Sequence, residues 1–191
     1  LVQVAAGLDR EQAVAAATAV AEAVAQQALL TPTALVPIPT KTGVAQNAFA
    51  VDYDFPDGAN LEISSLWSID DSLGVLAAGV PGIMLVWISS PDTLLELNLD
   101  PEDDLDTILN GYVEVVDGSN IQEPEVFETN TGREGVSVTY VSERGQNTLA
   151  LALRFDDGTS GVLEINVLNA AGFNQALQES IVNARDTFNR S

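Results

Sequence analysis

The C-terminal stretch at residues 133–190 constrains the fold more than any other, because it reads as three strands followed by a helix. In its first run, Val136, Val138 and Tyr140 alternate mainly with polar residues. This period of two is typical of a strand with one buried face. The segment 142–146 then supplies a short hairpin loop whose glycine tolerates a positive φ. A second strand, antiparallel to the first, is therefore expected.

The second and third runs continue this pattern. Leu149, Leu151 and Leu153 share one face of the second run. The segment 156–158, Asp-Asp-Gly, is a tight-turn signal, and the run at 163–167 that follows it again places an apolar residue at every second position. The three runs together predict an antiparallel meander.

A helix closes the chain. Its apolar residues recur at helical spacing and form a stripe wide enough to dock on a sheet. A helix docked on the apolar face of the meander gives an α+β layer architecture. The stripe consists of Phe173, Leu177, Ile181, Ala184 and Phe188.

The beginning of the chain differs in composition from the rest. Residues 1–30 are rich in alanine and predict a helix, with Asp9 as its N-cap and Gln12 three residues later. Residues 31–46 hold three prolines among threonines, which is the composition of an extended linker. A chain of 191 residues is long enough for one core at residues 47–191 plus this appendage.

The first half of the expected domain alternates strands and helices. A continuous apolar run at 82–89 indicates a central strand, and Asp100 followed by proline is typical of a helix start. The expected elements are strands at 48–54 and 61–67, a short helix at 70–78, a strand at 82–89, a loop or single helical turn at 93–99, a helix from residue 100, and a weak strand at 125–129.

The charge and the missing residue types exclude several functions. The chain has 7 Lys and Arg residues against 28 Asp and Glu residues, a net charge of −21, so we expect it to bind neither nucleic acid nor anionic membranes. Because it contains no histidine and no cysteine, Ser-His-Asp and Cys-His catalysis and thiolate zinc sites are excluded. No apolar run reaches the ~18 residues that span a bilayer.

The chain opens at Leu1 rather than at a methionine. This start is compatible with removal of an upstream secretion or lipoprotein signal, and equally with a shortened chain. An extracytoplasmic location, either secreted or anchored to the cell envelope, is expected in the first case. The oligomeric state stays open.

One acidic cluster has the composition of a site for a hard cation. Asp100, Glu102, Asp104 and Asp106 place carboxylates at alternate positions, which suits Ca²⁺. The cluster departs from an EF-hand loop, because proline stands second, no glycine stands sixth, and Gly111 takes the place of the final glutamate. The alternative is an acidic helix start, where the helix dipole favours negative charge. No cofactor other than calcium is expected.

A pair of carboxylates for general acid–base hydrolysis is a second candidate. Asp52, Asp54, Glu62 and Glu164 stand on predicted strands, and glycan hydrolases use two carboxylates about 5 to 9.5 Å apart. With 28 acidic residues in the chain, however, a chance pair is also expected.

The two tryptophans are expected to differ in exposure. Trp67 ends a predicted strand beside a serine, so it is the better candidate for an exposed platform on which a sugar stacks. Trp87 lies inside the apolar run at 82–89 and is expected in the core.

The order of these segments, over about residues 47–188, resembles a known fold family. The chain is similar to uncharacterised bacterial extracytoplasmic proteins of the PsbP-like fold, which is named for an accessory protein of photosystem II. The resemblance implies an antiparallel sheet flanked by helices on both sides, an α/β/α sandwich, and a non-enzymatic accessory or binding role. It carries over no functional residue. The matching segments are Phe49-Ala-Val-Asp-Tyr-Asp-Phe-Pro-Asp-Gly, Ile63-Ser-Ser, Leu76-Ala-Ala-Gly-Val-Pro-Gly-Ile-Met-Leu-Val-Trp-Ile and Leu99-Asp-Pro-Glu-Asp-Asp-Leu-Asp-Thr-Ile-Leu, followed by the hairpins and the terminal helix.

The sequence therefore predicts a non-catalytic extracytoplasmic accessory domain that binds another protein. The expected binding surface is a groove between the sheet and the segment 76–99. Two alternatives stay open, a carboxylate-dependent glycan hydrolase and a calcium-responsive binding module.

Overall fold

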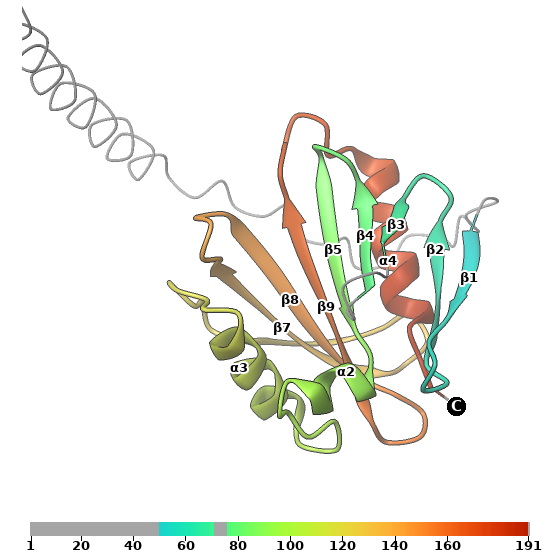
Figure 1. Ribbon diagram of the computed structural model, residues 1–191, viewed down its shortest axis with the longest axis vertical. Helices are drawn as coiled ribbons and strands as arrows, with labels where there is room; N and C mark the ends of the chain where they lie inside the picture. The colour runs from blue at the N-terminus through green and yellow to red at the C-terminus, as the bar shows by residue number, and fades with distance from the viewer. Residues whose placement is uncertain (1–49, 71–75, 191) are drawn as a thin grey trace, which may run out of the picture. The chain divides into compact units, whose positions relative to one another are not determined.

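Among the described residues, seven strands form one antiparallel sheet in the order β3-β4-β5-β9-β8-β7-β6, and β1 and β2 form a separate ribbon (Figure 1). The structure, a computed structural model, describes residues 50–70 and 76–190. The predicted helix at 1–30 and linker at 31–46 lie outside these residues. The elements are β1 (Ala50–Asp54), β2 (Asn60–Ser64), β3 (Ser68–Asp70), β4 (Leu76–Val80), β5 (Met84–Ser89), α2 (Pro91–Glu96), α3 (Leu105–Val115), β6 (Glu125–Glu128), β7 (Glu134–Val141), β8 (Asn147–Arg154), β9 (Ser160–Val167) and α4 (Gln175–Thr187).

The predicted meander is confirmed. Strands β7, β8 and β9 are neighbours in the sheet, with Val138 opposite Ala150 and Leu151 opposite Leu163. The strand β5, predicted as a central strand, pairs with β9 on one side and with β4 on the other. The described residues thus have the expected α+β class, an antiparallel sheet with helices packed on it.

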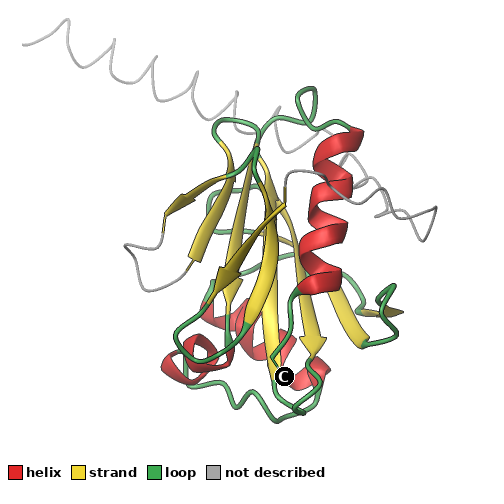
Figure 2. Cartoon of the chain, turned by 90° about the vertical axis from the view of Figure 1, so that its right-hand side faces the viewer, coloured by secondary structure: helices red, strands yellow, loops and turns green. Residues whose placement is uncertain are grey.

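One face of the sheet is covered by α4 and by the β1-β2 ribbon (Figure 2). The ring of Phe188, which follows α4, is completely buried and meets Phe155 edge-on with ring centroids 4.8 Å apart. The ribbon is joined to the end of α4 by the backbone bridge between Asn60 and Asn189. The buried residues shared by these elements include Leu61, Ile63, Leu151, Leu153, Leu163, Ile165, Ile181, Ala184 and Phe188.

The opposite face is covered by α2 and α3. Ala150 and Ala152 of β8 are completely buried there, and their small side chains leave room for the apolar stripe of α3. The buried residues of this stripe are Leu105, Ile108, Leu109, Tyr112 and Val113. The sheet is therefore the middle layer between two helical layers.

The short helix predicted at 70–78 is wrong. Strand β3 ends at Asp70, and Leu76–Val80 forms β4, in which Ala78 pairs with Val86 on one side and with Ile69 on the other. The alanines of this segment favour a helix locally, but pairing on both sides overrides that preference.

The predicted start of α3 at Asp100 is also wrong. The N-cap is Asp104, and a turn at residues 101–103 precedes it. The side chain of Asp100 accepts a hydrogen bond from the amide of Glu102 (3.0 Å) within this turn. The guanidinium of Arg154 donates to the carbonyl of Asp103 (2.6 Å), which fixes the turn against the sheet before the helix begins.

Replacing Phe188 with alanine tests how strongly the end of α4 is held. We expect Phe188→Ala to lower the free energy of unfolding by about 3–5 kcal/mol, because a fully buried aromatic side chain leaves a cavity between α4 and the sheet. Leu95, 55% exposed, is the control, and Leu95→Ala is expected to stay within about 0.5 kcal/mol of the wild type. Urea unfolding followed by circular dichroism measures both. Equal losses in the two variants contradict this account.

Candidate functional site

Strand β6 is an open edge of the seven-stranded sheet. It pairs with β7 on one side and with no other described strand. At the turn between them, the amide of Thr129 donates to the carbonyl of Arg133 (2.8 Å). Because hydrogen-bonded pairs alternate along an antiparallel ladder, Phe127 also points its backbone groups at β7. The N–H and C=O groups of Val126 and Glu128 therefore face away from the sheet.

The side chains of this edge are unusually exposed for apolar residues. Val126 is 72% exposed and Ile121, in the segment that leads into β6, is 51% exposed. All residues at 119–126 are exposed, although the segment is held along β7 by the Ser119–Val141 bridge. Exposed apolar side chains on an open edge are features of a surface that binds another chain.

A shallow, open depression of about 500 Å³ lies at this edge. The ring of Phe127 lies across Gly135 of β7, on the sheet face that carries α4, where even a methyl group on residue 135 would stand 2.4 Å from the ring. The lining residues are Val126, Phe127, Glu128, Gly132 and Glu134. The depression is too open to enclose a small molecule.

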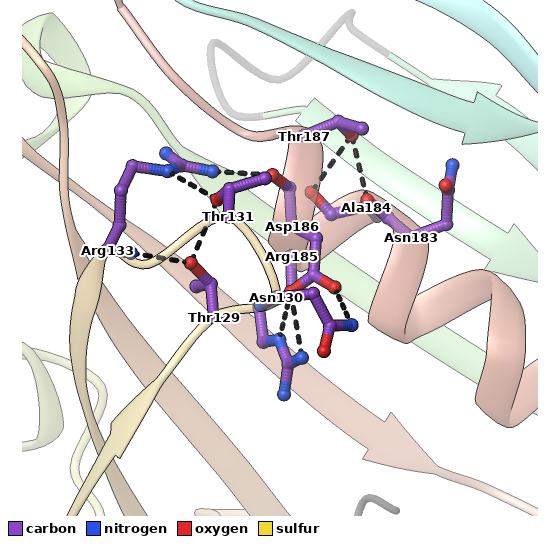
Figure 3. Close-up of polar contacts among 9 residues, drawn as sticks. All are labelled: Thr129, Asn130, Thr131, Arg133, Asn183, Ala184, Arg185, Asp186 and Thr187. Atoms are coloured by element: carbon purple, nitrogen blue, oxygen red, sulfur yellow. Dashed lines mark hydrogen bonds and ion pairs between the residues drawn. The ribbon is translucent and has the colours of Figure 1, made fainter. Parts of the chain in front are cut away.

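The turn beside the depression is locked to the end of α4 by Arg133 (Figure 3). Its guanidinium donates to the carbonyls of Asp186 (2.6 Å) and Phe188 and to the hydroxyl of Thr131 (3.2 Å). These carbonyls lie at the C-terminal end of a helix, where a cation is favoured by the helix dipole. Burial lowers the pKa of Arg133, and the negative charges of Asp156 and Asp186 oppose that shift.

A second link joins the same two segments through Asp186. Its carboxylate accepts hydrogen bonds from Asn130 in the turn and from the neighbouring Arg185 (2.8 Å) (Figure 3). The guanidinium of Arg185 lies 5.4 Å from the centre of the Phe127 ring, within range of a cation–π contact. The ring of Phe127 is therefore backed by a buried cation, and two links hold the turn to α4.

The open rim of the depression is acidic. Glu128 and Glu134 stand directly opposite each other on β6 and β7, and both are exposed. Like charges at such cross-strand positions repel each other. Glu123 and Glu125 add two more exposed carboxylates along the same edge.

The residues of the predicted calcium site are all exposed at the start of α3. Asp104 accepts a hydrogen bond from the hydroxyl of Thr107 (2.8 Å), and Asp100 is engaged within its own turn. In the part of the chain that the structure describes, no group of three or more acidic side chains could hold a metal ion. The arrangement of Asp100, Glu102, Asp104 and Asp106 thus gives the calcium interpretation no support.

The structure divides the candidate catalytic carboxylates between two places. Asp52 and Glu62 stand opposite each other on the β1-β2 ribbon, and Asp54 is opposite Asn60 there. Glu62 accepts a hydrogen bond from the side-chain amide of Asn183 (3.1 Å). Glu164 lies instead on β9, beneath α3. The four residues do not form one site.

The expected exposures of the two tryptophans are wrong. Trp67 is buried, and its indole N–H donates to the hydroxyl of Ser180 in α4 (3.0 Å). Trp87 is half-buried on β5, on the sheet face that carries α2 and α3. Trp67 is drawn inward because α4 passes over the chain at that point, which no local pattern near residue 67 indicates.

Glu164 belongs to a buried polar group between α3 and the sheet. It accepts hydrogen bonds from the hydroxyl of Tyr112 (2.9 Å) and from the side-chain amide of Asn166 (2.8 Å). Asn166 in turn accepts one from Thr148 (2.8 Å). Burial, and then the negative charge of Glu164, raise the pKa of Tyr112 and of Tyr140 well above the ordinary value. This is a structural role, because every contact is internal.

The β6 edge was expected only as a weak strand at 125–129. A signal for its edge position exists in the sequence, since Pro124 precedes it and glutamates occupy both its ends. Proline and charged residues are typical of edge strands. The contacts of Arg133 with α4 bridge more than 50 residues of sequence and carry no comparable local signal.

No protein family and no curated protein matches this chain. Among solved structures, it is similar to that of cyanobacterial PsbP (CyanoP) from Synechocystis sp. PCC 6803, with 14% sequence identity and a TM-score of 0.46. The similarity covers 80% of this chain and 98% of the cyanobacterial one.

Replacing Arg133 with lysine tests the lock between the turn and α4. A lysine keeps the charge but cannot reproduce the fork of donors, so Arg133→Lys should lower the free energy of unfolding by about 1–3 kcal/mol. Amide exchange at the end of α4 should rise as well. Arg144, exposed in the β7–β8 loop, is the matched control, and Arg144→Lys should change neither quantity. Unchanged exchange at residues 184–188 in Arg133→Lys would rule the lock out.

The two buried tyrosines make stability depend on pH in the alkaline range. Since their pKa values are raised in the folded protein, the unfolded chain loses protons above pH ~10 that the folded protein keeps. The free energy of unfolding is therefore insensitive to these groups below pH ~10, and each makes it fall by up to about 1.4 kcal/mol per pH unit above it.

Tyr112→Phe should reduce this alkaline slope, which urea titrations between pH 8 and 11.5 measure. The variant also loses the hydrogen bond to Glu164, and that loss appears as a constant offset already at pH 8. An alkaline slope equal to that of the wild type contradicts the assignment.

Proposed function

We propose that this chain is a non-catalytic accessory domain that binds another protein through the edge formed by β6 and residues 119–124. The observation that carries the proposal is the open strand itself: Val126, 72% exposed, sits on a strand with outward backbone groups and beside a depression. Adding a strand to such an edge is a recurrent way of binding an extended segment of a partner.

Rigidity supports this assignment. Arg133 and the Asn130–Asp186 contact hold the turn at 129–133 against α4, so the edge is already in the shape that a partner meets. A preformed surface loses little conformational entropy on binding. The groove expected near the segment 76–99 has weaker support, because Leu94 of α2 is completely buried and fills the space against the sheet.

The location of the domain is part of the proposal. The resemblance noted in the sequence favours a secreted or envelope-anchored protein. Residues 1–30 would form a helix and residues 31–46 a linker that tethers the domain. No helix within the described ranges is long and apolar enough to cross a membrane.

The test places a photo-crosslinking residue at Ile121, on the proposed edge, in the full chain and in the cells that make it. Ile121 is 51% exposed, and Leu95 on α2, 55% exposed, serves as the matched control position. We expect a discrete adduct with another protein from position 121 and none from position 95. Adding Val126→Pro should abolish the adduct, because proline removes an outward N–H without touching the bonds to β7.

Val126→Thr is the companion variant, since threonine keeps the N–H, the branched shape and the strand preference. The adduct should persist in it. An adduct that survives Val126→Pro, in a variant that circular dichroism shows to be folded, would falsify the proposed site.

A further inference from the structure

We infer that the partner segment bound at β6 is basic as well as extended, with a lysine or arginine side chain placed between Glu128 and Glu134. This inference rests on the proposed function and adds the chemistry of the ligand. It starts from the outward-facing N–H and C=O groups of Val126 and Glu128, which allow one short strand to pair with β6.

The charge of the β6 edge indicates which kind of partner strand it binds. Glu128 and Glu134 occupy opposite positions on β6 and β7, and both line the depression. By the alternation of the ladder this is a non-hydrogen-bonded pair, in which opposing side chains come closest. Two carboxylates held there repel each other until a cation is placed between them.

Among the described residues, Arg133 and Arg185 flank the depression, but neither is available for that task. Arg133 donates to the carbonyls at the end of α4, and Arg185 is buried and paired with Asp186. Both guanidiniums are thus engaged behind the depression, not at its rim. We therefore assign the compensating charge to the partner.

The neighbouring side chain also fits the shape of such a residue. Val126 lies two positions before Glu128, so its exposed apolar side chain stands on the same face of β6 as the two carboxylates. A lysine or arginine can lay its aliphatic stem on Val126 and place its charged end between Glu128 and Glu134. Because side chains alternate along a strand, basic residues at every second position of the partner would face the same side.

The experiment titrates three acetylated and amidated hexapeptides into the full, isotope-labelled chain and follows its amide resonances. The probes are Lys-Val-Lys-Val-Lys-Thr, the same peptide with glutamine in place of lysine, and the same with glutamate. We expect the lysine peptide to shift resonances of residues 121–134 and to bind more weakly as salt is raised. The glutamine peptide should bind at least fivefold more weakly, and the glutamate peptide should not bind.

Variants distinguish attraction of the peptide by the two carboxylates of the edge from attraction by the overall negative charge of the chain. Glu128→Gln with Glu134→Gln should weaken the lysine peptide about fivefold, the effect of losing two exposed ion pairs. The matched double variant Glu96→Gln with Glu143→Gln removes the same charge from exposed positions elsewhere and should have little effect. Val126→Pro should abolish binding, and Val126→Thr should retain it.

Four outcomes overturn the inference. Equal binding of the glutamine peptide removes the role of charge, and equal weakening by the two double variants shows diffuse attraction only. No binding of any peptide, together with a crosslink at position 121 that Val126→Pro abolishes, rejects a basic strand but leaves the proposed function standing. If no peptide binds and no crosslink forms at position 121, both this inference and the proposed function are rejected.

Discussion

Burial of the sheet on both faces is the constraint on which the rest of the structure depends. Seven of the eight residues of β9 are buried, so this strand can exist only with a layer on each side. The alanines of β8 make room for α3, and the leucines between them meet α4 and the ribbon. Burial at roughly 25 cal/mol per Å² of apolar surface makes these two interfaces the main source of stability.

The two helical layers do not extend over the β6 edge of the sheet, and this edge carries the exposed backbone groups. Strand β6 extends past the cover of α3, which leaves Val126 in solvent on that face. On the other face, the end of α4 contacts β6 and the turn after it through Arg133, Arg185 and Asp186. A rigid but uncovered strand follows directly from how far the two helices reach.

The closing meander could be predicted because each of its strands carries its pattern locally. Leu149, Leu151 and Leu153 alternate as one face requires, and the stripe of α4 has helical spacing from Leu177 to Phe188. Such signals depend only on residues a few positions apart, so they can be read from the sequence without knowledge of the fold.

The failures share a long-range cause. Strand β4 is alanine-rich and local preference points to a helix, but pairing with β3 and β5 decides its state. The burial of Trp67 depends on Ser180, 113 residues away. The hydrogen bonds of Arg133 to the end of α4 likewise join residues far apart in the sequence, at separations of 53 and 55 residues. Contacts of this kind are set by topology, which the spacing of residues does not encode.

An exposed edge strand carries a risk of pairing with a second copy of the same chain. At the opposite edge, β3 limits that risk by its length, since it has only three residues. At β6 the protection comes from charge: a second copy would bring a further Glu128 and Glu134 against the same two carboxylates. The net charge of −21 adds repulsion between copies at a distance, but salt screens it beyond about 8 Å. The carboxylates of the edge itself therefore determine whether two copies can pair there. The groups that keep copies of this chain apart are therefore the ones that favour a cationic strand, and a single pair of residues gives the edge both properties.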